Sequence, residues 1–294
     1  MSIATQITAL QNDKTAIAAI ITNRGGTLSS TYGFDTFAAD IATIPEGASL
    51  SILDNNGTRT DFTQVFKDCT ALESIPGLDL QRATVLAKMF MGCTSLEWNS
   101  GDPLIPTGTV QNISSMFSGC TSLVNANMFV TTGQPTITNA NSVFYGCSNL
   151  EQVTMPNLHN ATDVGSMFYA CRKLLYIDGA LDFSSYNGTN RAIFGYCEKL
   201  AGVSFVKNSI HIPELSFAAT QYLSDNSLVS IANGLQETSG TSRILRLHQA
   251  DQSRLQSIMG TTDASGTFTI WAQGSISLED FILNDKGWSI VYGA

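Results

Sequence analysis

The stretch Met116-Phe117-Ser118-Gly119-Cys120-Thr121-Ser122-Leu123 recurs along most of the chain. Its pattern is an aliphatic residue and Phe, then Cys three residues later and Leu three residues after that. All six cysteines share this position, at intervals of 24, 27, 27, 24 and 26 residues: Cys69, Cys93, Cys120, Cys147, Cys171 and Cys197. A seventh, degenerate copy is expected at Tyr222/Asp225/Leu228, with Asp in place of Cys. Such self-similarity predicts a solenoid whose repeats bury their apolar faces against one another.

Within one copy, the spacing places Phe, Cys and Leu on the same side of a short helix or turn. The third residue after Leu is usually apolar, as at Ile75, Val153 and Ile177, and this predicts a short strand followed by a turn. Stacked coils place equivalent residues about 4.8 Å apart along a parallel ladder. We therefore expect Phe to stack on Phe, Leu on Leu and Cys on Cys.

The repeated motif resembles the signature of BspA-like leucine-rich repeats, the bacterial surface protein type, over about residues 50–232. This resemblance implies an α/β repeat fold, a leucine-rich-repeat solenoid of about seven repeats of 24–28 residues. Such repeats occur mainly in bacterial surface proteins and their phages, where they serve adhesion. The family has no catalytic residues to transfer to this chain.

The composition narrows the class of partner. The chain has 294 residues, a formal net charge of −9 and 13% charged residues, and Ser, Thr, Asn and Gly are expected to fill its surface. A neutral polar surface suits an extracellular or virion protein. Nucleic acid is not expected as a partner, because no run of Lys and Arg is present to neutralise phosphates. The chain contains no stretch of 18 apolar residues, so membrane insertion is not predicted. Met1 leads into an amphipathic segment rather than a signal peptide, which favours a phage particle released by lysis.

The cysteines allow three interpretations: buried thiols, disulfides or a metal site. The repeat places each Cys where a small buried apolar group is needed, which is a usual position for a free thiol. Neighbouring coils bring cysteines close together, but a parallel ladder points their Cβ atoms in the same direction rather than at each other. Buried thiols are the favoured prediction, and no metal or cofactor is expected.

The N-terminal segment predicts an amphipathic helix over residues 2–22. A stripe with alternating steps of four and three residues is interrupted only by Lys14 and consists of Ile3, Ile7, Leu10, Ile17 and Ile21. Ile at both seam positions of a coiled coil favours three or four strands, so the stripe is a candidate homotrimer interface. The alternative is one helix packed on its own domain.

Residues 5–46 resemble a module found near the ends of phage tail and fibre proteins, in which Gly25-Gly26 separates the first helix from a second one ending at Pro45. The resemblance implies a phage structural protein whose N-terminal end attaches to other virion proteins or drives oligomerisation. The predicted organisation is a helical module at 1–47, the solenoid at 48–240 and an α/β cap at 241–294.

The cap prediction depends on the repeat pattern, which fades after Ile231. Residues 243–247, 267–271 and 286–290 read as strands, and residues 250–259 as a helix. Ser277 followed by Asp280 resembles a capping box that opens a second helix. A solenoid needs a terminal unit over its last open coil, although a separate functional tip is the alternative. The segment Asn284-Asp285-Lys286-Gly287-Trp288 also resembles the ends of phage repeat proteins.

No catalytic residue is predicted. The three histidines occur in unrelated contexts, and no nucleophile, metal or phosphate motif is present, so the protein is expected not to be an enzyme. The best binding candidates lie on the predicted strands, where aromatic rings stack on sugars and carboxylates accept hydroxyl hydrogen bonds. This stripe comprises Glu73, Glu97, Trp98, Glu151 and Tyr176. Tyr145 and Tyr169, each directly after a repeat Phe, form a second candidate stripe on another face.

Together these observations predict a non-enzymatic phage virion protein, a tail-fibre or receptor-binding component that presents its repeats to a host surface protein or glycan. A capsid decoration or head-fibre protein is the first alternative. A bacterial surface adhesin is the second, and its location would be the cell surface rather than the virion.

Overall fold

A computed structural model describes most of the chain, at residues 59–75, 78–98, 104–129, 136–188, 192–238 and 242–293. The predicted helical module at 1–47 lies outside these residues. The candidate homotrimer stripe lies there as well, so the structure does not test it: Ile3, Ile7, Leu10, Ile17 and Ile21.

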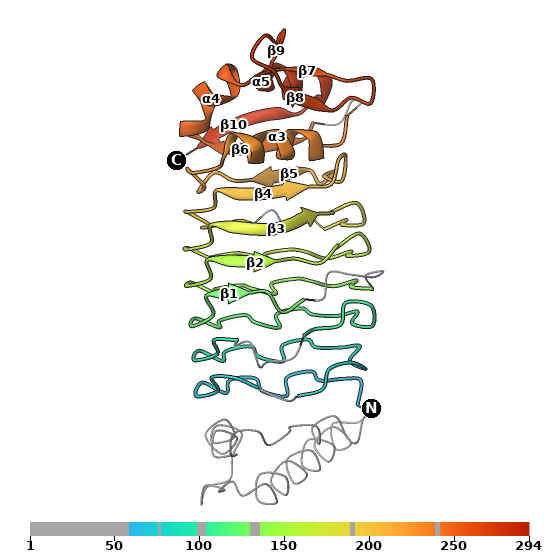
Figure 1. Cartoon of the computed structure of the whole chain (residues 1–294), viewed down its shortest axis with the longest axis vertical. Coiled ribbons are helices and arrows are strands. Elements are labelled where there is room, and N and C mark those ends of the chain that lie inside the picture. The colour runs from blue at the N-terminus through green and yellow to red at the C-terminus, as the bar shows by residue number, and fades with distance from the viewer. Residues whose placement is uncertain are drawn as a thin grey trace, which may run out of the picture.

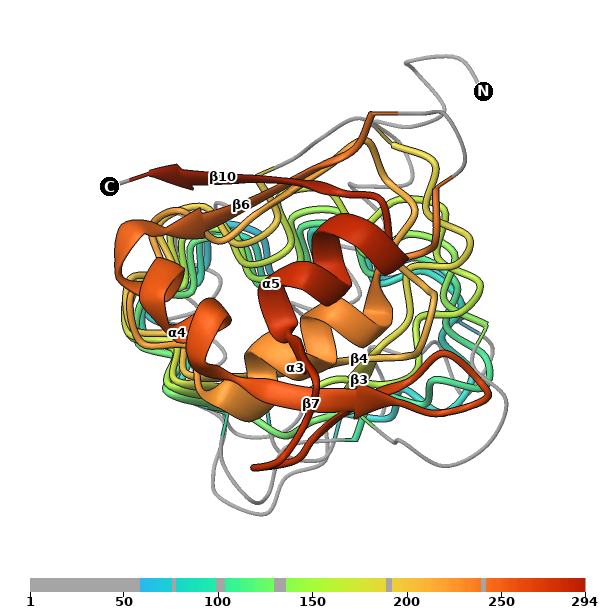
Figure 2. The same cartoon turned by 90° about the horizontal axis from the view of Figure 1, so that it is seen from above.

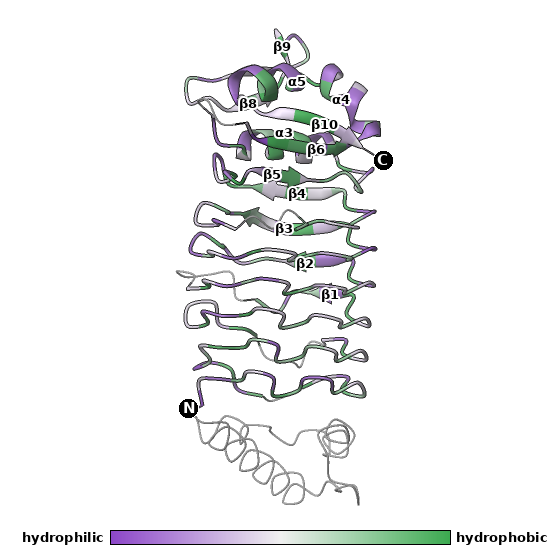
Figure 3. Ribbon diagram, turned by 180° about the vertical axis from the view of Figure 1, so that it is seen from behind, coloured by the Kyte–Doolittle hydropathy of each residue, from purple (hydrophilic) through white to green (hydrophobic). Residues whose placement is uncertain are grey.

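The described chain forms an elongated stack of coils (Figure 1). Four short strands lie directly above one another in a parallel sheet, in the order of the sequence: β1 (Asn125–Ala126), β2 (Gln152–Thr154), β3 (Tyr176–Leu181) and β4 (Gly202–Phe205). Each strand begins two residues after the repeat Leu. The predicted strand is therefore confirmed in these four coils, and the second residue of each strand is buried. Hydrophobic and hydrophilic residues are mixed along the coils (Figure 3).

The motif itself folds as consecutive turns rather than as a helix. In the third copy the N–H of Cys120 donates to the carbonyl of Phe117 (3.0 Å), and the N–H of Leu123 donates to that of Cys120 (3.3 Å). Gly119, directly before the cysteine, has φ +78°. A positive φ at the third residue of a turn ends helical geometry and favours glycine. The positive φ is therefore the backbone requirement at the position before each Cys: Gly or Ala meets it in four copies, and Asp68 (φ +61°) and Tyr196 (φ +59°) adopt it in the other two.

Hydrogen bonds between coils follow the same repeat. The N–H of Phe117 donates to the carbonyl of Val143 in the next coil (2.9 Å), and the N–H of Gly119 donates to that of Tyr145 (2.8 Å). Equivalent bonds link the neighbouring coils. Because the turns satisfy their backbone groups on the adjacent coil, the solenoid needs few regular helices or strands.

The core contains a continuous stack of aromatic rings. Neighbouring rings lie 4.7–5.9 Å apart with interplanar angles of 3–17°, through Phe66, Phe90, Phe117, Phe144, Phe168, Phe194 and Phe217. The first six are the predicted repeat phenylalanines, and their stacking is confirmed.

All six cysteines are buried thiols. Five of them also donate a hydrogen bond to the carbonyl of the Phe in the preceding coil, as Cys147 Sγ does to Phe117 at 3.0 Å. Burial raises the pKa of Cys147 and of Cys197 to about 12, so these thiols keep the proton that they donate. The cysteine position therefore needs a small side chain that carries a donor as well as apolar surface.

The predicted seventh copy at Tyr222/Asp225/Leu228 is wrong. The ring that continues the stack is Phe217, and the seventh copy is Phe217/Thr220/Leu223. Thr220 is fully buried and its hydroxyl donates to the carbonyl of Cys197 (3.1 Å), as a cysteine thiol would donate to a carbonyl in the coil before it. Tyr222 is instead 57% exposed. The interval from Cys197 to Thr220 is 23 residues, shorter than any interval between cysteines, and Thr replaces Cys.

Helix α3 (Asp225–Gly234) covers the last edge of the four-stranded sheet. Ser227 and Ser230 use their hydroxyls to accept hydrogen bonds from the free N–H groups of β4, at Val203 (3.1 Å) and Phe205 (2.9 Å). Ser227 also donates to the carbonyl of Ala201 (2.9 Å). The helix thus takes the place of the next strand and ends this ladder.

A second parallel sheet crosses the predicted boundary at residue 240. It consists of β5 (Glu214–Ser216), β6 (Ile244–His248) and β10 (Ser289–Gly293), in the order β10-β6-β5. Because β5 precedes this boundary and pairs with β6 beyond it, the cap continues the stack directly. Viewed along the axis, α3 and the cap helices lie across the end of the coils (Figure 2).

The rest of the cap largely follows the prediction. Strand β6 and helix α4 (Gln252–Ser257), which follows the short η2 helix (Gln249–Asp251), lie where expected. An antiparallel sheet contains β7 (Met259–Thr262), β8 (Phe268–Ile270) and β9 (Ile276–Ser277), of which only β8 was predicted. Ser277 Oγ accepts from the N–H of Asp280 (3.0 Å), which confirms Ser277 as the N-cap of α5 (Leu278–Asp280); its hydroxyl also donates to the Asp280 carboxylate (2.7 Å), so the reciprocal half of a capping box is replaced by this contact. The helical segment η3 (Phe281–Asp285) follows it.

Candidate functional site

The residue after each repeat Phe lies on the outside of the solenoid, because the Phe side chain occupies the core. In two successive coils this residue is a tyrosine. The rings of Tyr145 and Tyr169 stack 5.0 Å apart at an interplanar angle of 10°. The structure therefore brings together the two members of the second predicted stripe.

A third ring, absent from the prediction, extends this group. Tyr196 lies edge-on to Tyr169, at 5.2 Å and 83°. Gly195 makes this arrangement possible, because a Cβ atom there would lie 2.8 Å from Tyr169 Cδ2. The sequence does carry a signal: Tyr196 stands before Cys197, where most copies have Gly or Ala. Tyr145, Tyr169 and Tyr196 are named the tyrosine ladder.

The ladder is accessible at both ends. Tyr145 is 41% exposed and Tyr196 49% exposed, while Tyr169 is partly covered between them. Desolvation and the neighbouring phenols of Tyr196 and Tyr145 raise the pKa of Tyr169, against the opposing effect of Arg172. Arg172 lies over the Tyr196 ring, with Cζ 5.4 Å from its centroid, and forms an ion pair with Glu198. The Tyr169 phenol is therefore held as a neutral donor and acceptor.

A shallow groove of about 420 Å³ adjoins the ladder. It is named the β5 groove because Glu214 and Ser216 of β5 line it, together with Tyr169 and Tyr196. The rest of its lining consists of Phe194 and the small residues Ala192, Gly195, Ala218 and Ala219. Glu214 Oε1 accepts a hydrogen bond from Arg246 Nε of β6 at 2.9 Å. The groove thus combines apolar surface, aromatic rings and a neutralised carboxylate.

The first predicted stripe is less continuous than expected. Glu73, Glu97 and Glu151 are exposed, and Tyr176 is 51% exposed with its ring over Gly202. Tyr176 also lines a shallow hollow of about 240 Å³ on the strand face.

The prediction that Trp98 stands on this stripe as a stacking surface is wrong. Its ring is partly buried and packs edge-on against Phe90 at 5.5 Å and Phe117 at 5.3 Å. Trp98 has φ +58°, which turns the chain away from an extended strand at this position.

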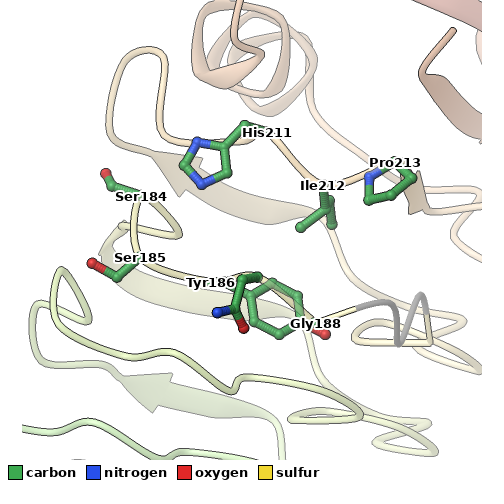
Figure 4. Close-up of a pocket in the computed structure, with 8 residues that line it drawn as sticks. Ser184, Ser185, Tyr186, Gly188, His211, Ile212 and Pro213 are labelled. Atoms are coloured by element: carbon green, nitrogen blue, oxygen red, sulfur yellow. The ribbon is translucent and has the colours of Figure 1, made fainter. Parts of the chain in front are cut away.

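A further hollow of about 300 Å³ lies at the corner after β3, lined by Ser184, Ser185, Tyr186, Gly188 and His211 among others (Figure 4). Beside it, the buried carboxylate of Asp182 binds His159 Nδ1 (3.1 Å) and accepts from the Ser184 hydroxyl and N–H. Burial would raise the pKa of Asp182, but the hydrogen bonds from Ser184 and His159 outweigh it and lower that pKa.

This corner does not have the geometry of an activated serine. The Ser184 hydroxyl donates to Asp182, the same carboxylate that binds His159, whereas a catalytic serine is hydrogen-bonded to the histidine. Across the described ranges, no group of three or more His, Cys, Asp and Glu side chains is placed to hold a metal ion. No helix within those ranges is long and apolar enough to cross a membrane.

One comparison with known proteins agrees with the repeat architecture. Residues 130–238 match the BspA type leucine-rich repeat region, in six copies, so the chain carries a BspA-type repeat region and a leucine-rich-repeat type of fold. Residues 60–178 match a family described as a Mycoplasma protein of unknown function, DUF285. A solved leucine-rich repeat protein from Bacteroides ovatus is 13% identical, with 64% of this chain and 67% of that one covered and a TM-score of 0.23. The search of curated proteins found no match.

Proposed function

We propose that this protein is a non-enzymatic adhesion protein that binds a ligand on a host surface, a protein or a glycan, through the tyrosine ladder. The observation that carries the proposal is the set of three contacting tyrosine rings, two of them more than 40% exposed, on a repeat scaffold with few charges. The match to the BspA-type repeat region supports adhesion, because such proteins are typically exposed on a surface.

The packing of the ladder suits recognition. Tyrosine offers a large, rigid contact surface and a polar hydroxyl, and it loses little conformational entropy on binding. Tyr169 is already held between Tyr145 and Tyr196, so much of its ordering has taken place before a ligand arrives. A ladder built into successive coils also gives a fixed spacing, which suits an extended ligand that runs along the solenoid.

The finer form of the proposal places the protein in a phage virion, as a tail-fibre or receptor-binding component. Its support is the resemblance of residues 5–46 to phage tail and fibre modules and of residues 284–288 to the ends of phage repeat proteins. In this arrangement the N-terminal module binds other virion proteins, and the repeats face the host. The alternative location is the surface of a bacterial cell, which the BspA-type match favours.

Binding of the fluorescently labelled full-length protein to whole cells of candidate hosts tests the adhesion proposal. The triple variant Tyr145→Ala/Tyr169→Ala/Tyr196→Ala should lose at least about tenfold in affinity, because buried aromatic contacts carry a large share of binding energy. Tyr222→Ala is the matched control, since Tyr222 is even more exposed (57%) but lies outside the ladder. Equal binding by the triple variant and the wild type would reject the ladder as the adhesive surface.

The location is tested separately with antibodies raised against the solenoid. Density-gradient fractions of an induced lysate should carry the chain with intact virions, and immunogold labelling should decorate the particles. Labelling confined to bacterial cell surfaces would overturn the virion placement and leave the adhesion proposal in place.

A further inference from the structure

We propose that the β5 groove is a subsite for a neutral sugar, in which one ring packs beside Tyr196 and its hydroxyls bind the Glu214–Arg246 pair. This inference rests on the proposed function, since it names the ligand class of the same surface. It concerns residues that the sequence did not single out, and it separates a glycan from a protein ligand.

The aromatic part of the groove is suited to the C–H face of a sugar. Tyr196 lines the groove and is 49% exposed, and its edge contact with Tyr169 holds the ring in place. Packing of C–H groups against an aromatic ring is apolar and dispersive, so it requires a ligand with a flat, weakly polar face.

Small residues provide the space. The two residues that follow Phe217 are Ala218 and Ala219. At the same positions the coils of Phe144 and Phe168, the fourth and fifth of the stack, have Tyr145-Gly146 and Tyr169-Ala170. The ladder therefore stops at coil six, and the next coil has no large side chain at these two positions. The resulting volume of about 420 Å³ lies within the range of small-molecule sites, roughly 300–1,000 Å³.

The polar part of the groove favours a neutral ligand over a charged one. Glu214 is 16% exposed and its Oε1 is already bound to Arg246, which is 39% exposed. A cationic side chain of a peptide would have to compete with the guanidinium for the carboxylate. Adjacent hydroxyls on a sugar need no such exchange, because one donates to the carboxylate while its neighbour accepts from the guanidinium.

The charge around the ladder points the same way. Arg172, which lies over the Tyr196 ring, is paired with Glu198. Arg172 and Arg246 are thus each paired with a carboxylate. An anionic glycan would therefore gain little from them, and recognition relies on hydroxyl groups and ring packing.

The test uses saturation-transfer difference NMR on the full-length protein. The neutral probes are oligosaccharides of glucose, galactose and N-acetylglucosamine, and the charged probes are a hyaluronan oligosaccharide and an oligolysine peptide. At least one neutral probe should show transfer to its ring C–H protons. Its affinity should fall at least about tenfold in Tyr196→Ala and in Glu214→Gln and stay within about twofold of wild type in Tyr222→Ala.

A further variant, Ala219→Trp, fills the groove without altering the ion pair, and it should abolish binding even if Glu214→Gln is poorly folded. Absence of transfer to every neutral probe, or binding of oligolysine that Tyr196→Ala abolishes, would overturn the sugar subsite. Cell binding that depends on the ladder would then still uphold the adhesion proposal. Conversely, sugar binding without any ladder-dependent cell binding would sustain the subsite and reject the proposed function.

Discussion

Removal of one ring from the middle of the phenylalanine stack tests whether the stack, rather than burial alone, holds the solenoid together. Phe144 is fully buried, with Phe117 stacked on one side at 5.6 Å and Phe168 on the other at 5.9 Å. Truncation of a buried Phe to Ala costs about 3–5 kcal/mol. Because both flanking rings are held by their own neighbours, the cavity cannot collapse easily, and we expect Phe144→Ala to fall near the upper end, at about 4–5 kcal/mol.

Phe144→Leu separates the two contributions. Leucine keeps most of the apolar volume but loses two stacked contacts, each worth about 0.5–1.5 kcal/mol, so the expected cost is about 1–3 kcal/mol. Phe183 is the comparison residue because it is equally buried but its aromatic contacts, with Tyr186 and Phe205, are edge contacts. Edge contacts are worth about as much as stacked ones, so Phe183→Leu should also cost about 1–3 kcal/mol.

The stabilities of all three variants are measured by equilibrium unfolding in guanidinium chloride, followed by far-ultraviolet circular dichroism. Hydrogen exchange with mass spectrometry adds a local readout: Phe144→Ala should lower protection in the coils of Phe117 and Phe168, because each coil contacts only its neighbours. A cost for Phe144→Leu of less than about 1 kcal/mol, with unchanged protection in the flanking coils, would refute the role of stacking.

Three further predictions concern the turns, the thiols and one carboxylate. Ala170 has φ +62° at a position where three copies have Gly. Ala170→Gly should therefore raise the free energy of unfolding by about 1 kcal/mol, and Gly146→Ala should lower it by a similar amount, as measured by thermal melts. No change in either variant would show that the positive φ of the turn does not select glycine. Burial raises the pKa of Cys147 to about 12, so at about pH 8 iodoacetamide should label it only as fast as the chain opens, and labelling in mild denaturant should track unfolding. Fast native labelling would contradict this. The pKa of Asp182 is lowered from its ordinary value of 3.8, so the ionised carboxylate stabilises the fold above that pH and this contribution is lost as the pH falls below it. Asp182→Asn should therefore flatten the dependence of the unfolding free energy on pH in this acidic range. An unchanged pH dependence would contradict this prediction.

The repeat could be predicted because one chemical requirement recurs at every coil. Each copy needs a Phe that stacks, a small donor that reaches a carbonyl and a Leu that is buried, so the spacing of these three residues is the same each time. The ring stack and the strands after Leu in four coils therefore followed from the sequence. The seventh copy was misplaced because its Cys position is occupied by Thr220, whose hydroxyl donates to a carbonyl as a Cys thiol does. A sequence search for Cys, or for the Asp that was expected to replace it, does not find this residue.

The candidate site was only half predictable. Tyr145 and Tyr169 occupy the same position in adjacent coils, so periodicity alone indicated that they meet. Tyr196 joins them from a different position in the motif, and only the absent side chain at Gly195 allows it. The prediction for Trp98 was wrong although the residue lies at the expected position in the motif. Its backbone has a positive φ, and its ring packs on the core. The Glu214–Arg246 pair joins residues 32 positions apart through a sheet that crosses into the cap, and no motif encodes it.

The end of the four-stranded sheet presents the last test. An open parallel edge invites another strand, and natural proteins cover such edges. Here Ser227 and Ser230 of α3 bind the N–H groups of Val203 and Phe205, both of which belong to buried residues. Replacement of both serines by alanine leaves two buried donors unsatisfied, at about 1–3 kcal/mol each.

The double variant Ser227→Ala/Ser230→Ala should therefore loosen α3 and free the edge of β4 for pairing with a second chain. We expect a lower melting temperature together with concentration-dependent self-association in light scattering. Ser204→Ala is the matched control, since that serine lies on β4 itself but faces outward, with a long contact to the carbonyl of Gly179 (3.4 Å). A double variant that melts like the control and stays at the wild-type mass would show that α3 ends the ladder by apolar packing alone, and that the two hydroxyls are dispensable.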